Sequence, residues 1–333
     1  MDGEIPVIDI SGFGDGTGPA AHEIARLIDD ACQSIGFLVV TGHGIKTSTL
    51  DGLHGVASTF FDLSQATKNI YQAPEGSFYG YIPMESSTLA YSLDDGEAKP
   101  DLREAFASSR PDIATGDPYF RSEAVAHFGF DVDFPSEVGG FHATWTSSYY
   151  ALSDLAARMM KIFAVALGMP LDYFDASLER HASNLALFNY PEQTKPPQKG
   201  QLRGGAHTDF GSLTLVHSDW SLPGGLEVQL PDGRWIAAPN VPGAFIVNLG
   251  DMMARWTNDR WVSTMHRVAN PPAAAGPAAR RQSAVFFHVP DYDAIVSCIP
   301  SCATAANPAK YQPITVANHH MMKMGKMFEE EVA

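Results

Sequence analysis

Residues 204–220 read GGAHTDFGSLTLVHSDW, and this stretch holds both a predicted β-strand and a pair of candidate metal ligands. Its second half, SLTLVHS (212–218), alternates apolar and polar side chains, as a half-buried strand does. Similar short runs lie around it, separated by turn signals such as Pro-Gly, Asp-Gly and Asn-Asp. They are NLALFNY (184–190), GLEVQL (225–230), RWIAAP (234–239), AFIVNL (244–249), WVSTMHRV (261–268) and QSAVFFHV (282–289). Several short strands at this spacing predict an antiparallel sandwich or barrel.

The residues before 171 have a different pattern, in which apolar side chains recur at helical spacing. The predicted elements are a strand at 5–10, a helix at 19–35, a strand at 36–45, two short helices within 47–71, a strand near 102–108 and a long helix at 141–167. Beyond the strand-rich part, a Met-rich helix is expected at roughly 316–329.

Together these elements predict an all-β core, a double-stranded β-helix or jelly-roll barrel, with flanking α-helices that are mainly N-terminal. We expect one domain over residues 1–333. Within it, residues 1–170 form a mixed, largely helical region. Residues 171–292 form the jelly-roll core with the metal site, and residues 293–333 form a C-terminal helical segment.

The composition is that of an ordinary globular protein, with 45% hydrophobic and 18% charged residues among 333. No apolar run is long enough to span a bilayer, and the start MDGEIPVIDI lacks the features of a signal peptide. Three cysteines suit a reducing compartment, so a cytoplasmic location is expected. The net charge of -16 argues against nucleic acid and anionic membranes as partners. A small-molecule substrate is compatible with it, and the oligomeric state is not readable.

His207 and Asp209 form an H-x-D pair, and side chains two residues apart on a strand share one face. We therefore expect both to point into the barrel. A histidine on a later inward face would complete a triad of two histidines and one carboxylate, which leaves iron with open positions. His266 in WVSTMHRV fits, because it alternates with Val262, Thr264 and Val268.

The pair alone is weak, because about one H-x-D is expected by chance in a chain with 12 histidines. His217, a few residues later on a strand, is a rival ligand in principle. A zinc hydrolase is a further alternative for the same three ligands. It would need a positioned acid, such as the glutamate of H-E-x-x-H, and would leave Arg281 without a role.

Arg281 comes directly before the apolar run QSAVFFHV (282–289), and Ser283 is the second residue of that run. The two residues are two positions apart, so they share one face of the predicted strand. Burying an arginine costs desolvation free energy unless the guanidinium pairs with an anion. A planar guanidinium can bind a carboxylate with two hydrogen bonds. The dicarboxylate 2-oxoglutarate could dock its distal carboxylate here. The alternative is that Arg281 has a purely structural role, in an internal ion pair with an Asp or Glu.

The chain resembles the isopenicillin N synthase-like branch of the iron(II)/2-oxoglutarate-dependent oxygenases, over nearly its whole length. The motifs occur in the order of that family: GFLVVTGHGI (36–45), ASTFFDLSQATKNIY (57–71), FYGYIP (78–83), DLREAF (101–106), NLALFNYPEQ (184–193), AHTDFGSLTLV (206–216), GLEVQL, GRWIAAPNVPGAFIVNLGDMM (233–253), STMHRV (263–268) and the R-x-S strand. The resemblance implies that His207, Asp209 and His266 bind Fe(II). It also implies that Arg281 and Ser283, with a hydrogen bond from Tyr190, bind 2-oxoglutarate.

By the same resemblance the activity is a dioxygenase reaction with O2. It would oxidise, most simply hydroxylate, a small molecule, in keeping with secondary metabolism, and release succinate and CO2. Two alternatives stay open. The first is an iron oxidase of the same fold that uses no 2-oxoglutarate and performs cyclisation or desaturation, as a few family members do. The second is a catalytically silent jelly-roll protein that binds a small molecule.

Candidate substrate contacts are aromatic, apolar or basic side chains in the resembling segments and on the terminal helix near Met321 and Met324. They are Phe78, Tyr79, Tyr81, Arg103, Leu187, Leu213, Phe287 and His288. Each is an ordinary core residue by default. Arg103 is the charged candidate for a carboxylate-bearing substrate, although Asp101 and Glu104 are alternative partners for it. The identity of the substrate is not readable from the sequence.

Overall fold

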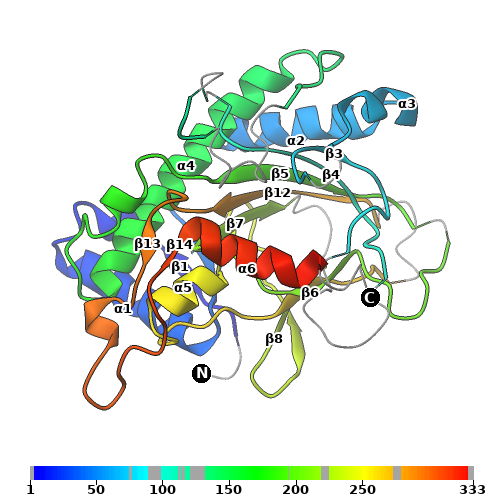
Figure 1. Cartoon of the computed structure of the whole chain (residues 1–333). Coiled ribbons are helices and arrows are strands. Elements are labelled where there is room, and N and C mark those ends of the chain that lie inside the picture. Colours follow the sequence, from blue (N-terminus) through cyan, green and yellow to red (C-terminus); the bar gives the residue numbers. More distant parts are fainter. Residues whose placement is uncertain are drawn as a thin grey trace.

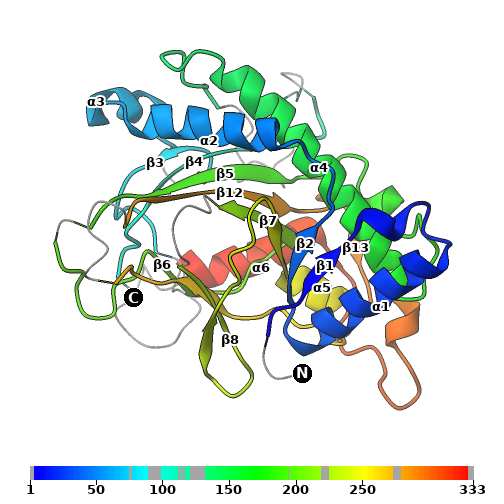
Figure 2. The ribbon, with the colours of Figure 1, turned by 180° about the vertical axis from the view of Figure 1, so that it is seen from behind.

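The computed structural model describes residues 4–74, 77–88, 99–111, 113, 117–120, 132–193, 195–218, 225–272 and 279–328 (Figure 1). In this part of the chain, two β-sheets lie face to face and helices cover the outer face of the larger one (Figures 1 and 2). Side chains of both sheets meet between them, as where the rings of Phe37 and His266 lie edge to face with centroids 5.3 Å apart.

The larger sheet has eight strands in the order β1-β2-β10-β7-β12-β5-β4-β3. All neighbours are antiparallel except β1 and β2, which are parallel. The strands are β1 (Val7–Asp9), β2 (Phe37–Thr41), β3 (Gly80–Ile82), β4 (Glu104–Ser108), β5 (Asn184–Tyr190), β7 (Leu213–Ser218), β10 (Phe245–Leu249) and β12 (Arg281–His288).

The smaller sheet has four antiparallel strands in the order β6-β11-β8-β9. These are β6 (Gly204–His207), β8 (Leu226–Gln229), β9 (Trp235–Ala237) and β11 (His266–Val268). A separate hairpin pairs β13 (Ile295–Val296) with β14 (Ile314–Thr315).

Helices flank the sheets on several sides (Figures 1 and 2). They are α1 (Pro19–Ser34), α2 (Thr47–Phe61), α3 (Gln65–Lys68), α4 (Phe141–Ala166), α5 (Asp251–Trp256) and α6 (Val316–Phe328), with 3-10 turns at Ser11–Phe13, Asn69–Tyr71, Asp175–Ser177 and Pro300–Cys302. Helices α2 and α4 lie over the larger sheet, whereas α6 runs beside the gap between the two sheets (Figure 1). None of the helices described is both long and apolar enough to cross a membrane.

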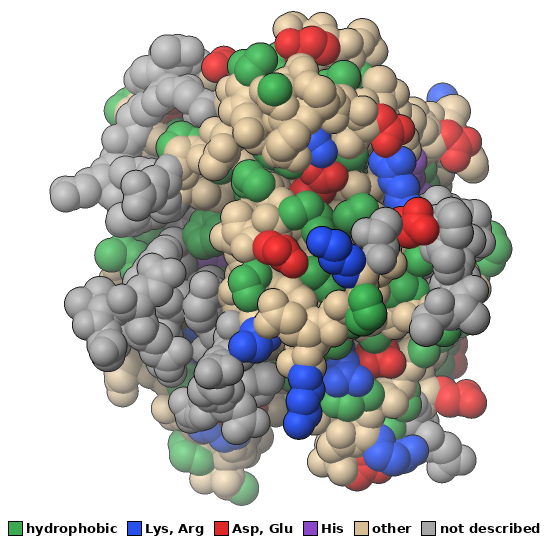
Figure 3. Space-filling model, turned by 90° about the vertical axis from the view of Figure 1, so that its right-hand side faces the viewer, with side chains coloured by type: hydrophobic (Ala, Val, Ile, Leu, Met, Phe, Trp, Pro, Cys, Tyr) green, Lys and Arg blue, Asp and Glu red, His purple; other side chains and the backbone are tan. Residues whose placement is uncertain are grey.

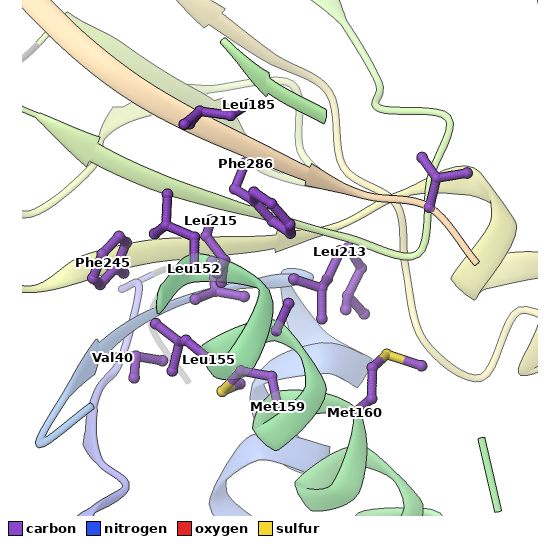
Figure 4. Close-up of a cluster of buried hydrophobic side chains, with 14 of the residues drawn as sticks. Val40, Leu152, Leu155, Met159, Met160, Leu185, Leu213, Leu215, Phe245 and Phe286 are labelled. Atoms are coloured by element: carbon purple, nitrogen blue, oxygen red, sulfur yellow. The ribbon is translucent and has the colours of Figure 1, made fainter. Parts of the chain in front are cut away.

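The main core lies between α4 and the outer face of the larger sheet (Figure 4). Leu152, Leu155 and Met159 of α4 recur at helical spacing and face the sheet, and all three are buried. Alternate residues of the strands, such as Leu215 and Phe286, meet them from the other side (Figure 4). The intervening residues of the same strands therefore point to the inner face, between the two sheets.

The helix predictions are confirmed to within a few residues, but several predicted strands are shorter than expected, among them those at 36–45 and 261–268. The alternation at 261–268 predicts a strand throughout, whereas β11 begins at His266. The Thr264 hydroxyl donates 2.7 Å to the carbonyl of Ile35 instead, so the segment before His266 is tied to the end of α1. Gly36 makes this approach possible, because its φ is 65° and a Cβ there would lie 2.1 Å from the carbonyl oxygen of Val262.

The N-terminal region contributes half of the strands of the larger sheet; the sequence predicts strands at the places of β1, β2 and β4 but not at β3. Four of the eight strands, β1 to β4, precede residue 171. The core sheet thus extends beyond the predicted range 171–292. Helix α5 is also absent from the sequence-based expectation, because its six residues are too few to show a helical period.

A buried ion pair ties α3 to the outer face of β4. Lys68 Nζ lies 2.7 Å from Glu104 Oε2, and the two side chains are only 8% and 5% exposed. Lys68→Met should lower the free energy of unfolding by about 3–5 kcal/mol, since it leaves a buried carboxylate without its cation. Urea denaturation measures this. The exposed pair Arg234–Asp232 supplies the control, because Arg234→Met should change stability by about 1 kcal/mol or less. Equal effects for the two variants would contradict the assignment.

On the face shown in Figure 3, Lys and Arg side chains lie among acidic and apolar ones. The described part of this face therefore does not present the continuous basic surface typical of nucleic-acid binding.

Candidate functional site

Three side chains converge on the inner face at the edge of the smaller sheet. His207 ends β6 and His266 begins β11, and the two residues are direct partners in the antiparallel register. Asp209 Oδ1 lies 3.7 Å from His207 Nε2 and 3.8 Å from His266 Nε2. One possible ligand atom from each of the three residues lies within 4.8 Å of the other two. The structure therefore brings together all three predicted metal ligands.

Both imidazoles are oriented by backbone carbonyls. His207 Nδ1 lies 2.8 Å from the carbonyl oxygen of Gly205, and His266 Nδ1 lies 3.1 Å from that of Thr264. Because a carbonyl can only accept, each Nδ1 must carry the proton. Each Nε2 then directs its lone pair toward the other ligands, which is the tautomer that a metal requires.

Asp209 does not lie on a strand, contrary to the expectation from its spacing to His207. Strand β6 ends at His207, and Asp209 lies in the turn that follows. Its carboxylate is instead fixed by two donors from the larger sheet. Thr214 Oγ1 and Asn248 Nδ2 each lie 2.6 Å from Oδ2, so Oδ1 remains directed at the histidines.

The turn that carries Asp209 packs tightly against the loop before α5. The backbone N–H of Asp251 donates 2.7 Å to the carbonyl of Asp209. At Gly250 a Cβ would lie 2.2 Å from the carbonyl oxygen of Gly211, so only glycine fits there. The Asp251 side chain accepts from Thr208 at 3.1 Å and pairs with Lys323 of α6 at 2.5 Å. The C-terminal helix is thereby linked to the turn that lies between the ligands.

The electrostatics favour the protonation states that bind a cation. Burial, reinforced by the neighbouring His266, lowers the pKa of His207 to about 3. Burial alone would raise the pKa of Asp209, but His266, His207 and the hydrogen bonds from Asn248 and Thr214 outweigh it, and the pKa is lowered. At neutral pH the site thus offers a neutral imidazole at 207 and a carboxylate at 209.

A second polar cluster lies on the inner face of the larger sheet. Arg281 is paired in register with Tyr190, and Ser283 is paired with Ser218. Arg281 Nη2 lies 2.5 Å from Ser218 Oγ, and its Cζ lies 5.2 Å from the centre of the Tyr190 ring. All four side chains are buried. The predicted cosubstrate residues are therefore neighbours on one inward face.

Arg203 adds a second buried guanidinium beside this cluster. Its Cζ lies 5.9 Å from the centre of the Tyr190 ring, and it donates to the carbonyls of Pro191 and Ala279. Burial, followed by the charge of Arg281, lowers the pKa of Arg203 to about 10. The two arginines thus place two buried guanidinium groups at this end of the inner face.

The structure divides the candidate substrate contacts between the two faces. Tyr79 and Phe287 pack with the inner-face cluster, and Arg103 stacks on Phe188 of the same cluster. Phe78 is 42% exposed and Met321 is 48% exposed. The side chain of Met324 lies outside the described residues.

Four other candidates point to the helix-covered face. Tyr81, Leu187 and Leu213 belong to the main core, and Tyr81 donates to Glu104 at 2.6 Å. His288 Nδ1 lies 2.7 Å from Ser212 Oγ, and His288 is opposite Leu213 in register. The expectation that these four line a substrate pocket does not fit this placement, because the sheet itself separates them from the metal ligands.

The side chains that support the site are not among the predicted residues. Thr214 and Asn248 sit on the inner face opposite each other in register, and Ser218 lies two strand alternations beyond Thr214. The alternation in SLTLVHS does carry a signal for Thr214 and Ser218, because both are polar positions of a strand that follows the H-x-D pair.

Comparison with known families gives two matches, one in each half of the chain. The family described as "non-haem dioxygenase in morphine synthesis N-terminal" matches residues 5–125. The 2OG-Fe(II) oxygenase superfamily matches residues 181–290, which contain all three candidate metal ligands and Arg281.

Individual relatives and solved structures agree over nearly the whole chain. The chain is 31% identical to the 2-oxoglutarate-Fe(II) type oxidoreductase hxnY of Emericella nidulans, covering 93% of this chain and 86% of the relative. It is 32% identical to homoarginine-6-hydroxylase 2-ODD-233 of Oryza sativa subsp. japonica, over 91% and 88% of the two chains. The structure superposes on that of a full-length Neurospora crassa protein in complex with alpha-KG and thymine with a TM-score of 0.83 and 28% identity, covering 98% of each chain. With the geometry above, these matches show that the chain belongs to the 2OG-Fe(II) oxygenase superfamily and is a 2-oxoglutarate-dependent Fe(II) dioxygenase.

Proposed function

We propose that Fe(II) is held by His207 Nε2, Asp209 Oδ1 and His266 Nε2, and that Arg281, Ser283 and Tyr190 bind the distal carboxylate of 2-oxoglutarate. The enzyme hydroxylates a small molecule in the space between the two sheets, which are the two halves of a double-stranded β-helix. The observation that carries the proposal is the convergence of three ligand atoms within 4.8 Å at the edge of the smaller sheet, across from the inner face of the larger sheet, which holds the buried Arg281.

The donor set fits Fe(II). Two neutral imidazole nitrogens and one carboxylate oxygen are the ligands of the facial triad, which leaves further positions on the metal for cosubstrate and oxygen. The hydrogen bonds that Thr214 and Asn248 donate to Asp209 both go to Oδ2, so Oδ1 is left for the metal. The carbonyls at Gly205 and Thr264 hold both rings in place before the metal binds.

The second cluster fits a dicarboxylate. Arg281 is 5% exposed, so its charge has lost most of its hydration and favours an anion with bidentate geometry. Ser218 orients the guanidinium, and the nearby charge of Arg203 adds to the positive potential. Ser283 and Tyr190 offer hydroxyl groups on the same face.

Bound iron and 2-oxoglutarate supply the oxidising chemistry, with oxygen consumed and succinate and CO2 released. The protein's own residues bind, orient and exclude water. Apolar side chains such as Val216, Val285 and Phe287 line the space between the clusters and keep it dry. None of the residues described is needed as a general base in this assignment.

The substrate is a small organic molecule, in keeping with the names of relatives that act on such compounds. These include homoarginine-6-hydroxylase and validamycin A dioxygenase, the latter from Streptomyces hygroscopicus subsp. limoneus and 28% identical over 99% of this chain. Hydroxylation is the outcome favoured by the hydroxylase names, and secondary metabolism is the favoured setting.

The test is a metabolite screen of the Fe(II)-loaded protein with 2-oxoglutarate and oxygen. Succinate should form above the rate without added metabolite, together with a product 16 Da heavier than its substrate, the mass of one oxygen atom. Oxygen consumption with product formation but without succinate would instead indicate an oxidase that uses no 2-oxoglutarate. Iron binding without any oxygen consumption across the screen would contradict the proposal.

The partners of Asp209 should tune iron affinity. Thr214→Val keeps the shape of the side chain but removes the hydrogen bond to Oδ2, so the Kd for Fe(II) should rise about 10–100-fold. Anaerobic titration of the metal measures this. Thr59→Val, an exposed position of α2 whose hydroxyl bonds the carbonyl of Gly55, is the matched control and should leave the Kd unchanged. An unchanged Kd in Thr214→Val would remove Thr214 from this role.

A further inference from the structure

Arg103 is an inward-facing cation that the metal and cosubstrate sites do not use. It precedes β4 by one residue, and Ala105, which alternates with it, is opposite Phe188 on the inner face. The guanidinium Cζ lies 4.5 Å from the centre of the Phe188 ring. Phe188 in turn is the register partner of Ser283, so Arg103 lies along the same inner face as the cosubstrate cluster.

The guanidinium of Arg103 has hydrogen-bonding capacity to spare. The side chain is 11% exposed, and the carboxylate that lies nearest to it in the described part of the chain, Asp101 Oδ2, is 3.5 Å from Nη2. Within the described residues the guanidinium donates no hydrogen bond, although it has five N–H groups. The other oxygen of Asp101 accepts from the backbone N–H of Gly205 at 2.8 Å, so this carboxylate is shared.

The neighbouring acid does not compensate Arg103 either. Glu104 points to the opposite face, where Lys68, Tyr81 and Asn189 satisfy it. A guanidinium that has lost most of its water and makes one long ion contact is electrostatically costly unless another anion joins it.

The segment that carries Arg103 lies beside the metal ligands. The N–H of Leu102 donates 2.9 Å to the carbonyl of Leu202, and Asp101 bonds Gly205 on β6, two residues before His207. A substrate group bound by Arg103 would therefore lie beside the start of β6. Arg103 would in this way hold the substrate next to the metal ligands.

We infer that Arg103 binds a carboxylate of the substrate, and that the enzyme acts on small carboxylic acids with an apolar body. This rests on the proposed function. A carboxylate matches the fork geometry of the guanidinium, whose other face is covered by Phe188. The apolar body would contact the side chains that share this face, Tyr79, Val285 and Phe287.

The experiment compares acids with their primary amides, which have nearly the same shape but no charge. The probes are phenylacetate, 3-phenylpropionate and octanoate with their amides, titrated calorimetrically into the anaerobic Fe(II)–2-oxoglutarate enzyme. In at least one pair the acid should bind about tenfold or more tightly than the amide. Arg103→Gln should reduce that ratio to about one, and Arg103→Lys should retain part of it because it keeps the charge. Arg26→Gln, on the exposed face of α1, is the control and should keep the full ratio.

Three results would overturn the inference. The first is a wild-type enzyme that binds no acid more tightly than its amide. The second is an Arg103→Gln variant that keeps the preference for acids. The third is a Kd for 2-oxoglutarate that rises in Arg103→Gln as much as in Arg281→Gln, which would assign Arg103 to the cosubstrate. If Arg103→Gln does not fold, the comparison of each acid with its amide in the wild type and in Arg103→Lys still tests the inference. A wild-type protein that turns over 2-oxoglutarate but prefers no acid contradicts only this inference, whereas one that forms no succinate contradicts the proposed function.

Discussion

Replacing His207 with alanine should abolish iron-dependent succinate formation while leaving the protein folded. Loss of a residue that merely supports a ligand typically costs about 10–100-fold in metal affinity or activity, so loss of a ligand itself should cost more than about 100-fold. His207 is not part of the main core and lies at the end of β6, so its removal deletes little packing. The bound iron is measured by metal analysis after desalting, and activity by succinate formed from 2-oxoglutarate.

His22→Ala is the matched control, because His22 is an exposed residue of α1. It should bind iron and form succinate as the wild type does, with the same circular dichroism spectrum as His207→Ala. If His207→Ala retained stoichiometric iron and full turnover, the assignment of His207 as an iron ligand would be wrong. His217 is not an alternative ligand. His217 lies on the helix-covered face, where it contacts His54 and Phe245.

Arg281→Gln should weaken 2-oxoglutarate binding strongly while iron binding remains. Removing one member of a buried, hydrogen-bonded charge pair costs about 2–5 kcal/mol, which corresponds to a rise in Kd of about 30- to 5,000-fold. The loss is large here because Arg281 is buried and Ser218 holds its guanidinium in place. Calorimetric titration of the anaerobic Fe(II) enzyme with 2-oxoglutarate gives the Kd directly.

Arg280→Gln supplies the comparison at the adjacent position. Arg280 pairs with Asp62 at 2.7 Å on the surface, with side chains 36% and 61% exposed. Surface pairs of this kind contribute about 1 kcal/mol or less, so stability should change slightly and the Kd for 2-oxoglutarate should not. A Kd that is unchanged in Arg281→Gln, or raised equally in both variants, would show that the cosubstrate binds elsewhere.

The strand alternation predicts correctly which residues share a face, but not always which face is the inner one. On β12, Arg281 and Ser283 fix the inward parity, so Phe287 faces inward and His288, one residue on, faces the helices. On β5, Tyr190 is opposite Arg281 and faces inward. Leu187 lies three positions earlier on the same strand, so the alternation itself requires it to face outward once Tyr190 is placed inward.

Turn geometry marks a second limit of the sequence. The H-x-D spacing predicts His207 and Asp209 on one strand face, and the two do converge. They do so by another route, because the strand ends at His207 and the turn is held by Thr214, Asn248 and the close approach at Gly250. These contacts join residues up to about 40 positions apart, so only the assembled sheets bring them together.

The order of strands in the larger sheet constrains how chains of this kind can be recombined. Strands β1 and β2 complete one edge next to β10, and β3 and β4 complete the other next to β5. A chimaera that joins the first part of one homologue to the second part of another must therefore match pairs such as Val40 with Phe245 and Ala105 with Phe188. Where those pairs clash, β10 and β5 become open edges with unpaired backbone groups, which favour aggregation.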